Sequence, residues 1–213
     1  MVTVVHEDRS FVLRGGRTGV ILLHGLGGKP IEMQGIARGL ANAGYTVSCP
    51  QLAGHSGSRE EMRAARWQDW YGTLVDAHNA LKKDCDTIIV GGLSMGALLA
   101  LHHAAQEPKS VHGVIALAPL LRLDGWAVPM RAHLFRLVTT RWCARLFSFP
   151  ELGNYGVKDD RVRDVIKELV ARGGPAEAAR MLQPGEAMLE LQRLAKVVRR
   201  ELGVVQQPTL IVH

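Results

Sequence analysis

The 213-residue sequence lacks the features that define small secreted proteins, metal proteins and membrane-spanning proteins. Its three cysteines, Cys49, Cys85 and Cys143, are odd in number and far apart, which excludes a disulfide framework and a spaced redox or metal motif. We expect reduced, mostly buried thiols in a cytoplasmic protein. No histidine, cysteine and acid cluster has ligand spacing, so we expect neither a metal nor an organic cofactor.

The sequence also has no long apolar run. The uncharged stretch 87–101 is too short to span a membrane, and polar residues and glycines interrupt it. The first residues do not form a basic segment followed by an apolar one, as a secretory signal would. We therefore expect no stable membrane insertion.

Basic residues exceed acidic ones, 26 to 20, which gives a net charge of +6. Such a charge can attract nucleic acid. In the second half of the chain, however, arginines alternate with apolar residues at helical spacing, and no nucleic-acid motif accompanies them. We interpret these residues as solvated helix faces and expect no nucleic-acid partner.

Short apolar runs alternate with helical patterns over the first 120 residues. Strands are predicted at 17–24, 45–49, 87–90 and 114–117, and helices at 30–43, 67–81 and 95–105. Continuous apolar runs are typical of strands buried on both faces. The order predicts an α/β fold with a mostly parallel sheet covered by helices on both sides. Residues 2–13 predict an antiparallel hairpin at one edge.

The chain divides into three predicted parts. Residues 1–120 form the core, 121–203 form a helical insertion without a convincing strand, and the core resumes with a strand in 204–213. Within the insertion, helices are expected over 128–149, around 162–170 and from Pro184 onward. A helical insertion at the carboxyl edge of a sheet is a natural lid over a ligand crevice. Some of its apolar residues could line an acyl pocket, while most of them are expected to pack helices together: Trp126, Leu134, Phe135, Trp142 and Phe147.

Residues 92–96 read Gly-Leu-Ser-Met-Gly, which matches the Gly-x-Ser-x-Gly pattern of a nucleophile elbow. The pattern directly follows a predicted strand and precedes an apolar helix, which is the setting that this motif requires. The turn holds the serine in a strained backbone conformation and aims the N–H groups of the helix at a developing negative charge. Ser94 is therefore the candidate catalytic nucleophile.

A glycine-rich loop, residues 24–28 (His-Gly-Leu-Gly-Gly), follows the first buried strand. Neither a Walker phosphate loop nor a dinucleotide-binding loop fits its spacing. We expect the backbone N–H groups of Leu26 and Met95 to form an oxyanion hole. His24 is expected to orient this loop through a hydrogen bond rather than to act in catalysis.

These two segments, together with residues 50–58 (Pro-Gln-Leu-Ala-Gly-His-Ser-Gly-Ser), resemble bacterial carboxylesterases and monoacylglycerol lipases of the α/β-hydrolase superfamily. The resemblance covers residues 17–125 and 204–213, with Ser56 where the family loop has a glycine. It implies an α/β-hydrolase fold and hydrolysis of carboxylic esters through an acyl-serine intermediate. His55 is expected to be a turn histidine within this loop.

A serine nucleophile needs an acid and then a histidine after it in the chain order of this family. In the family these two residues follow the strand that residues 209–213 resemble, so we expect both, and the last strands of the sheet, to lie beyond His213. Asp124 and His133 are the internal alternative, while His102 and His103 are expected to point away from the crevice. On this view the 213 residues alone are nearly inactive.

The expected activity is hydrolysis of small ester substrates with short- to medium-chain acyl groups, or of monoglyceride-like esters. Amide or peptide hydrolysis and acyl transfer are alternatives, because the same elbow serves all of them and specificity resides in the lid. A non-catalytic module with a hydrolase-like fold is the third possibility.

Overall fold

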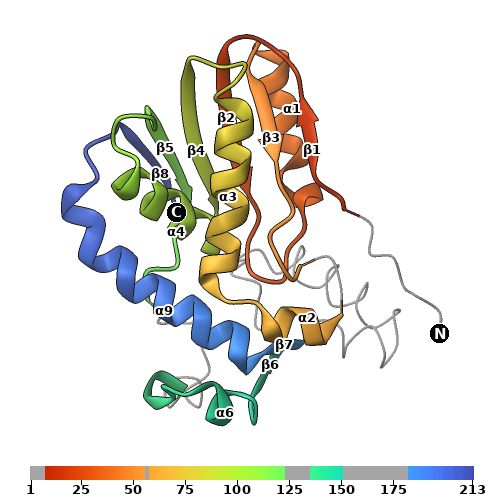
Figure 1. Cartoon of the computed structure of the whole chain (residues 1–213), viewed down its shortest axis with the longest axis vertical. Helices are drawn as coiled ribbons and strands as arrows, with labels where there is room; N and C mark the ends of the chain where they lie inside the picture. Colours follow the sequence, from red (N-terminus) through yellow and green to blue (C-terminus); the bar gives the residue numbers. More distant parts are fainter. Residues whose placement is uncertain (1–7, 56–57, 123–134, 151–181) are drawn as a thin grey trace.

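The computed structural model describes residues 8–55, 58–122, 135–150 and 182–213 (Figure 1). A six-stranded sheet lies at its centre, in the order β1-β3-β2-β4-β5-β8. The strands are β1 (Phe11–Leu13), β2 (Thr18–Leu23), β3 (Thr46–Cys49), β4 (Thr87–Leu93), β5 (Gly113–Leu117) and β8 (Thr209–Val212). All neighbours pair in parallel except β1, which runs antiparallel to β3. The predicted mostly parallel sheet is confirmed.

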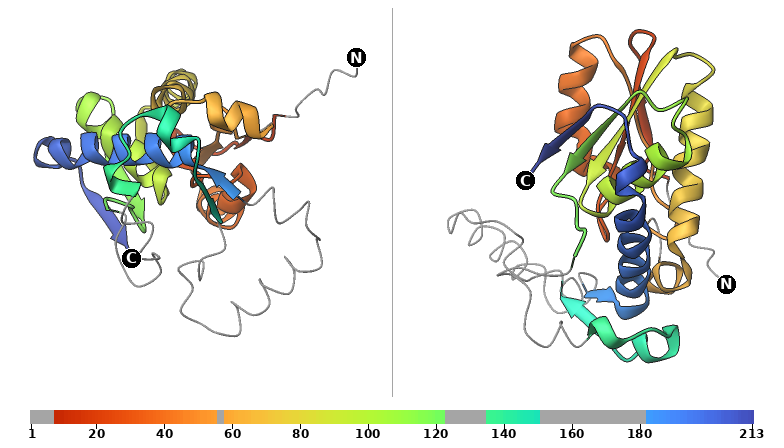
Figure 2. Two further views of the ribbon diagram at one scale, coloured as in Figure 1. Left: turned by 90° about the horizontal axis from the view of Figure 1, so that it is seen from below. Right: turned by 90° about the vertical axis from the view of Figure 1, so that its left-hand side faces the viewer.

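Helices cover both faces of this sheet (Figure 2). They are α1 (Gln34–Asn42), preceded by the 3-10 turn η1 (Pro30–Met33), then α2 (Arg59–Ala64), α3 (Trp67–Leu81) and α4 (Met95–Gln106). Side chains of β2 alternate between the faces: Val20 and Leu22 pack with α1, whereas Ile21 and Leu23 pack with α3 and α4. Both faces of β2 are buried, which explains its continuous apolar run.

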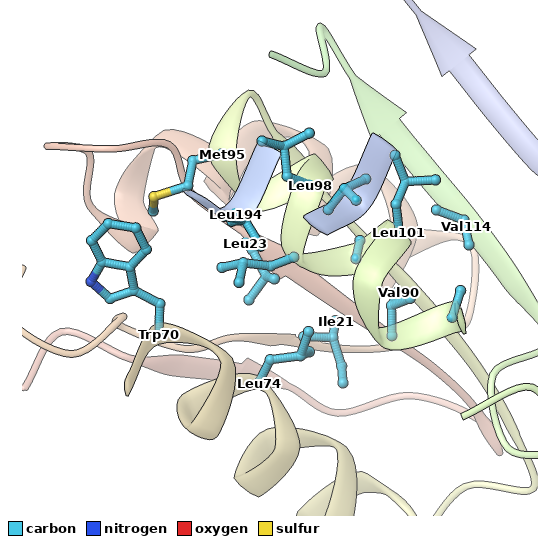
Figure 3. Close-up of a cluster of buried hydrophobic side chains, with 14 of the residues drawn as sticks. Ile21, Leu23, Trp70, Leu74, Val90, Met95, Leu98, Leu101, Val114 and Leu194 are labelled. Atoms are coloured by element: carbon cyan, nitrogen blue, oxygen red, sulfur yellow. The ribbon is translucent and has the colours of Figure 1, made fainter. Parts of the chain in front are cut away.

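The larger apolar cluster lies on the α3 and α4 side (Figure 3). Trp70 and Leu74 of α3 face Leu98 of α4 across this cluster, and all three are fully buried. Leu194 joins them from α9 (Gly185–Glu201), so this helix packs directly on the core although it lies within the predicted insertion 121–203. The carboxyl ends of the parallel strands and the amino end of α4 therefore belong to one rigid unit.

Two local expectations about the first half of the chain were incomplete. Within the described residues, β1 does not form a hairpin of its own but pairs with β3, with Phe11 opposite Cys49. The short helix α2 was not predicted. Its signal was present, because Ser58 and Glu61 have the spacing of a capping box, and the Ser58 hydroxyl accepts a hydrogen bond from the Glu61 N–H.

The expectation of an insertion without strands was wrong. Ser148–Pro150 (β6) pairs antiparallel with Leu182–Pro184 (β7), and the helix predicted over 128–149 is reduced, in the described residues, to the turn η2 (Phe135–Leu137) and the short α6 (Arg141–Ala144). Both strands end on a proline, and a residue before proline is biased toward extended backbone. The helix expected around 162–170 lies outside the described residues.

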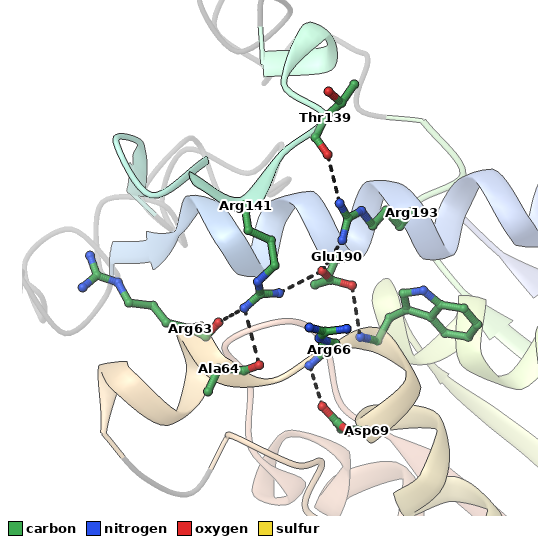
Figure 4. A network of polar contacts seen from close by, with 9 residues as sticks. Arg63, Ala64, Arg66, Asp69, Thr139, Arg141, Glu190 and Arg193 are labelled. Atoms are coloured by element: carbon green, nitrogen blue, oxygen red, sulfur yellow. Dashed lines mark hydrogen bonds and ion pairs between the residues drawn. The ribbon is translucent and has the colours of Figure 1, made fainter. Parts of the chain in front are cut away.

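A buried carboxylate holds α9 in place (Figure 4). Glu190 is 1% exposed and forms ion pairs of 2.8 Å with Arg141 of α6 and with Arg193 one turn along α9. The Trp67 N–H also donates to Glu190, at 3.5 Å. Arg141 further donates to the carbonyl oxygen of Arg63, the last turn of α2. The network therefore ties α9 to α6 and to the start of α3.

After α9 the chain turns through η3 (Leu202–Val204) into the edge strand β8. The side chains of β8 are exposed on both faces of the sheet. No helix in the described part of the chain is both long and apolar enough to cross a membrane.

Candidate active site

Ser94 lies at a sharp turn between β4 and α4. Its backbone has φ 55° and ψ −105°, in the left-handed region that non-glycine residues seldom adopt. The Ser94 N–H donates to the carbonyl oxygen of Leu117 at 2.8 Å, which ties the turn to the end of β5. A strained conformation held by its surroundings is typical of functional sites, as the sequence motif predicts.

The two glycines of the motif are required by close packing. A Cβ atom on Gly92 would lie 2.6 Å from the backbone carbon of Gly96, and one on Gly96 would lie 2.4 Å from the carbonyl oxygen of Leu23. Neither contact is possible for a real side chain. The turn can therefore approach β2 this closely only with glycine at both positions.

The glycine-rich loop after β2 lies beside this turn. A Cβ atom on Gly25 would be 3.6 Å from the Leu93 carbonyl oxygen and 3.9 Å from the Cβ of Ser94. Leu26, the next residue, is half-buried and packs against the larger core cluster. The structure thus brings together the two segments that the sequence places about 70 residues apart.

Two backbone donors remain available at this junction. Within the described residues, neither the Leu26 N–H nor the Met95 N–H donates to a protein acceptor. Met95 is the first residue of the 12-residue helix α4, so its N–H also lies at the positive end of the helix dipole. This pair of donors can hold an anionic oxygen next to Ser94.

Gln183 is a neighbour of this loop that the sequence analysis missed. It lies on β7, is buried, and its Nε2 stands 1.8 Å from where a Cβ on Gly27 would be placed. Gly27 has φ 75°, so glycine is favoured there for conformation as well as for space. The contact joins two distant segments, and no local pattern in the sequence could have indicated it.

His24 connects the glycine-rich loop to the loop that follows β3. Its Nδ1 lies 2.9 Å from the Gly25 carbonyl oxygen, and the Leu52 N–H donates to Nε2 at 3.1 Å. Both ring nitrogens are therefore occupied. Burial lowers the pKa of His24 to about 4. The predicted structural role of His24 is confirmed, because a neutral imidazole with two backbone partners connects two loops and has no free nitrogen for catalysis.

His55 lies in the loop that His24 contacts. Its Nδ1 lies 3.0 Å from the Ala53 carbonyl oxygen, and its ring packs edge-on against His24 and Trp70 with centroids 4.9 and 5.8 Å away. Burial, together with the neighbouring His24, lowers the pKa of His55 to about 4. These contacts agree with the expected turn histidine.

The two histidines of α4 face other helices rather than Ser94. His102 Nδ1 lies 2.7 Å from a carboxylate oxygen of Glu201 at the end of α9. His103 Nε2 lies 2.7 Å from His78 Nδ1 of α3, and its Nδ1 lies 3.2 Å from the Tyr71 hydroxyl. Their expected orientation away from the crevice is confirmed.

The candidate acid and base are not found among these side chains. In the ranges that the structure describes, no histidine or carboxylate hydrogen-bonds the Ser94 hydroxyl. Asp124 and His133 lie outside the described residues, and His213 is exposed after β8. No group of three or more His, Cys, Asp or Glu side chains in the described ranges could hold a metal ion.

The described residues do not support the predicted acyl pocket. Phe135 is buried in a small cluster with Ala144 and Leu189, whereas Trp142 is 76% and Phe147 42% exposed. Trp126 and Leu134 lie outside the described residues. None of these five is among the described lining of the cavity next to α9.

Comparison with known proteins agrees with this architecture. The thermostable monoacylglycerol lipase of Bacillus sp. (strain H-257) is 38% identical over 127 residues, 60% of this chain and 50% of the lipase. The carboxylesterase of Bacillus subtilis (strain 168) is 24% identical over 210 residues, 98% of this chain and 76% of the esterase. The match to the lipase thus spans half of that enzyme's length.

Among solved structures, one reported for the metagenome-derived lipolytic enzymes LipS and LipT is 29% identical. It superposes with a TM-score of 0.73 and covers 95% of this chain and 74% of its own. The family described as "Serine aminopeptidase, S33" (Hydrolase_4) matches residues 16–213. With its elbow, its glycine-rich loop and its parallel sheet, the chain belongs to this family of the α/β-hydrolase superfamily.

Proposed function

We propose that the protein is a serine hydrolase that cleaves carboxylic esters through an acyl intermediate on Ser94. The single observation that carries the proposal is the strained turn of Ser94 between β4 and α4, flanked by two backbone N–H groups without a described acceptor. The names of its monoacylglycerol lipase and carboxylesterase relatives support small ester substrates. Within this class we propose esters with short- to medium-chain acyl groups, or monoglyceride-like esters.

In this mechanism the Ser94 Oγ bonds to the ester carbonyl carbon, and the carbonyl oxygen becomes an oxyanion. The N–H groups of Leu26 and Met95 stabilise that oxyanion, each by about 3–4 kcal/mol in the transition state. Collapse of the intermediate breaks the bond to the alcohol oxygen, which leaves with the proton that Ser94 gave up. Water then attacks the acyl-serine, releases the carboxylic acid and restores Ser94.

The proton must pass through a base. We expect this base to be a histidine oriented by an acid, both supplied from outside the described residues. Asp124 and His133, which lie outside the described residues, are the internal candidates for this pair. His24 is excluded because backbone groups occupy both of its nitrogens.

Residues 121–203 are proposed as an insertion at the crevice, with residues 1–120 forming the first part of the core and 204–213 resuming it. Within this insertion α9 packs on the core, so the lid itself is proposed to be the part before α9. The position of Gln183 supports this assignment, because β7 of the insertion contacts Gly27 of the oxyanion loop. A movement of β7 would therefore shift the loop that carries Leu26, next to the proposed position of the oxyanion.

The proposal is tested by labelling with a fluorophosphonate probe, which reacts only with an activated serine. The protein expressed from its complete reading frame should be labelled and should hydrolyse p-nitrophenyl butyrate. The Ser94→Ala variant should lose both properties, while the Ser110→Ala control, which alters a serine paired with Glu107, should keep them. An unlabelled, correctly folded protein would favour the non-catalytic module instead.

The internal candidates for the acid and the base are tested separately. If His133 is the base, the His133→Gln variant should lose p-nitrophenyl ester turnover by on the order of 10⁶. Unchanged turnover in both His133→Gln and Asp124→Asn would exclude this pair.

Amide or peptide hydrolysis, or acyl transfer, is the second candidate because the matching family is described as an aminopeptidase. The elbow and oxyanion donors would serve these reactions equally well. Comparing kcat/KM for p-nitrophenyl butyrate, a butyryl thioester and an aminoacyl p-nitroanilide separates them. Preference for the anilide would overturn the ester assignment.

A further inference from the structure

A cavity of about 540 Å³ opens beside α9, away from the residues assigned to catalysis. It lies between the loop that follows β5, the segment after η2 and one face of α9. Ser94 is not part of its described lining. The volume falls within the roughly 300–1,000 Å³ that is typical of small-molecule sites in proteins.

One wall of the cavity is apolar. Leu120 of the loop, Val138 after η2 and Leu189 of α9 contribute to it. Leu189 and Val138 also belong to a small buried cluster around Phe135, so this wall is a packed surface. Such a surface can bury an alkyl chain and remove its CH₂ groups from water.

The lining also includes four cationic side chains and, among the described residues, no carboxylate: Arg122, Arg193, Lys196 and Arg199. Arg122, Lys196 and Arg199 are exposed to solvent. Three of them follow one another at i, i+3 and i+6 along α9 and share one side of the helix. The opposite side of α9, with Leu194 and Val198, packs into the core. The three cations of α9 therefore lie on the side of the helix away from the core, as does Leu189 of the cavity lining.

Two of these cations are held by hydrogen bonds. Arg193 pairs with Glu190 at 2.8 Å and donates to the Thr139 carbonyl oxygen at 2.9 Å (Figure 4). Arg199 donates to the Leu121 carbonyl oxygen at 2.6 Å. Among the described residues, neither Arg122 nor Lys196 has an ion-pair partner. Glu190 compensates the charge of Arg193, so an anion in the cavity would pair with Arg122, Lys196 and Arg199.

We propose that this cavity is a binding site for an anionic amphiphile, an alkyl chain that ends in a carboxylate or a phosphate group. The chain lies along Leu120, Val138 and Leu189, and the anionic head lies among the four cations. Arginine matches the geometry of both head groups, because its parallel N–H donors bind two oxygens at once. This site does not depend on the reactivity of Ser94.

Isothermal titration calorimetry with decanoate, decyl phosphate and decanol tests the site directly. Both anions should bind, with affinity that falls as the salt concentration rises to about 0.5 M, and decanol should bind far more weakly. The double variant Arg122→Glu with Lys196→Glu should bind each anion about tenfold less tightly, because two favourable charge contacts become repulsive. Whichever anion binds more tightly identifies the preferred head group.

The matched control carries the same change of net charge at exposed positions elsewhere. Arg38 lies on α1, on the opposite face of the sheet, and Lys109 follows α4. The variant Arg38→Glu with Lys109→Glu should bind both anions like the unaltered protein. Circular dichroism and Tm verify that each variant is folded. Equal affinity for decanol and decanoate, equal losses in the two double variants, or no binding of either anion would each overturn the proposal.

Discussion

Gly96 and Leu23 approach each other so closely that a Cβ atom on residue 96 would lie 2.4 Å from the Leu23 carbonyl oxygen. Leu23 ends β2, and Gly96 lies in the first turn of α4. This contact therefore sets the distance between the amino end of α4 and the loop that carries Leu26. The proposed oxyanion hole depends on that distance.

A methyl group at position 96 should disrupt this packing. The Gly96→Ala variant is expected to lose about 1–3 kcal/mol of unfolding free energy, because backbone atoms must move apart. It should also react more slowly with a fluorophosphonate probe. The control is Gly72→Ala in α3, where a Cβ meets nothing within 4 Å. That change should stabilise the protein by up to about 1 kcal/mol. Equal effects of the two substitutions in urea denaturation would contradict the argument.

The Met95 N–H can be removed without changing a side chain. An ester linkage in place of the peptide bond between Ser94 and Met95 replaces this donor by oxygen. We expect kcat for p-nitrophenyl ester hydrolysis to fall by about 10²–10³, with little change in KM, because the donor acts on the oxyanion of the transition state. The same replacement before Ala97, which also lies in the first turn of α4, serves as the control. A rate loss of similar size at both positions would indicate a general effect of the helix end.

Glu190→Gln tests the network that fixes α9. The substitution leaves Arg141 and Arg193 without their shared carboxylate, and removal of one partner from a buried ion pair typically costs about 3–5 kcal/mol. We expect about 2–3 kcal/mol here, since both arginine side chains retain contact with solvent. The exposed Glu60→Gln change on α2 should cost less than about 0.5 kcal/mol. Chemical denaturation measures both variants, and a neutral Glu190→Gln would show that the network adds no net stability.

The buried histidines predict a loss of stability in acid. Burial lowers the pKa of His24, His55 and His103 to about 4, against about 6.5 in the unfolded chain. At pH values between about 4 and 6.5, these histidines bind a proton in the unfolded chain but stay neutral in the folded protein. The unfolding free energy should therefore fall as pH decreases from about 6.5 to about 4, by up to about 1.4 kcal/mol per pH unit for each histidine.

Urea denaturation of His103→Gln isolates one of these contributions. Its stability curve should run parallel to that of the unaltered protein above about pH 7 and should be flatter between about pH 4 and 6.5. Parallel curves throughout the acid range would mean that His103 is protonated equally in the folded and unfolded states.

Much of the candidate site could be predicted from the sequence because its signals are local. Gly92 at the end of β4, Ser94 at the turn and Gly96 at the start of α4 belong to one short segment, and a Cβ on Gly92 would meet Gly96 within it. The parallel strands were predictable for a similar reason, since burial of both faces leaves a continuous apolar run in each strand. The prediction of a helix over 128–149 failed at Ser148–Pro150, which is a strand. The helical spacing of apolar residues indicates a helix there, whereas Pro150 favours extended backbone before it.

The sequence by itself determined the strand, turn and helix around Ser94, the glycine-rich loop beside it and the mostly parallel sheet. Only the tertiary structure decided that Gln183 lies against Gly27, that Glu190 binds Arg141 and Arg193, and that four cations share a cavity with an apolar wall. The physical reason is the range of the interactions. Backbone sterics and burial act on neighbouring residues and leave a periodic pattern, whereas ion pairs and cavities join segments whose separation along the chain carries no pattern.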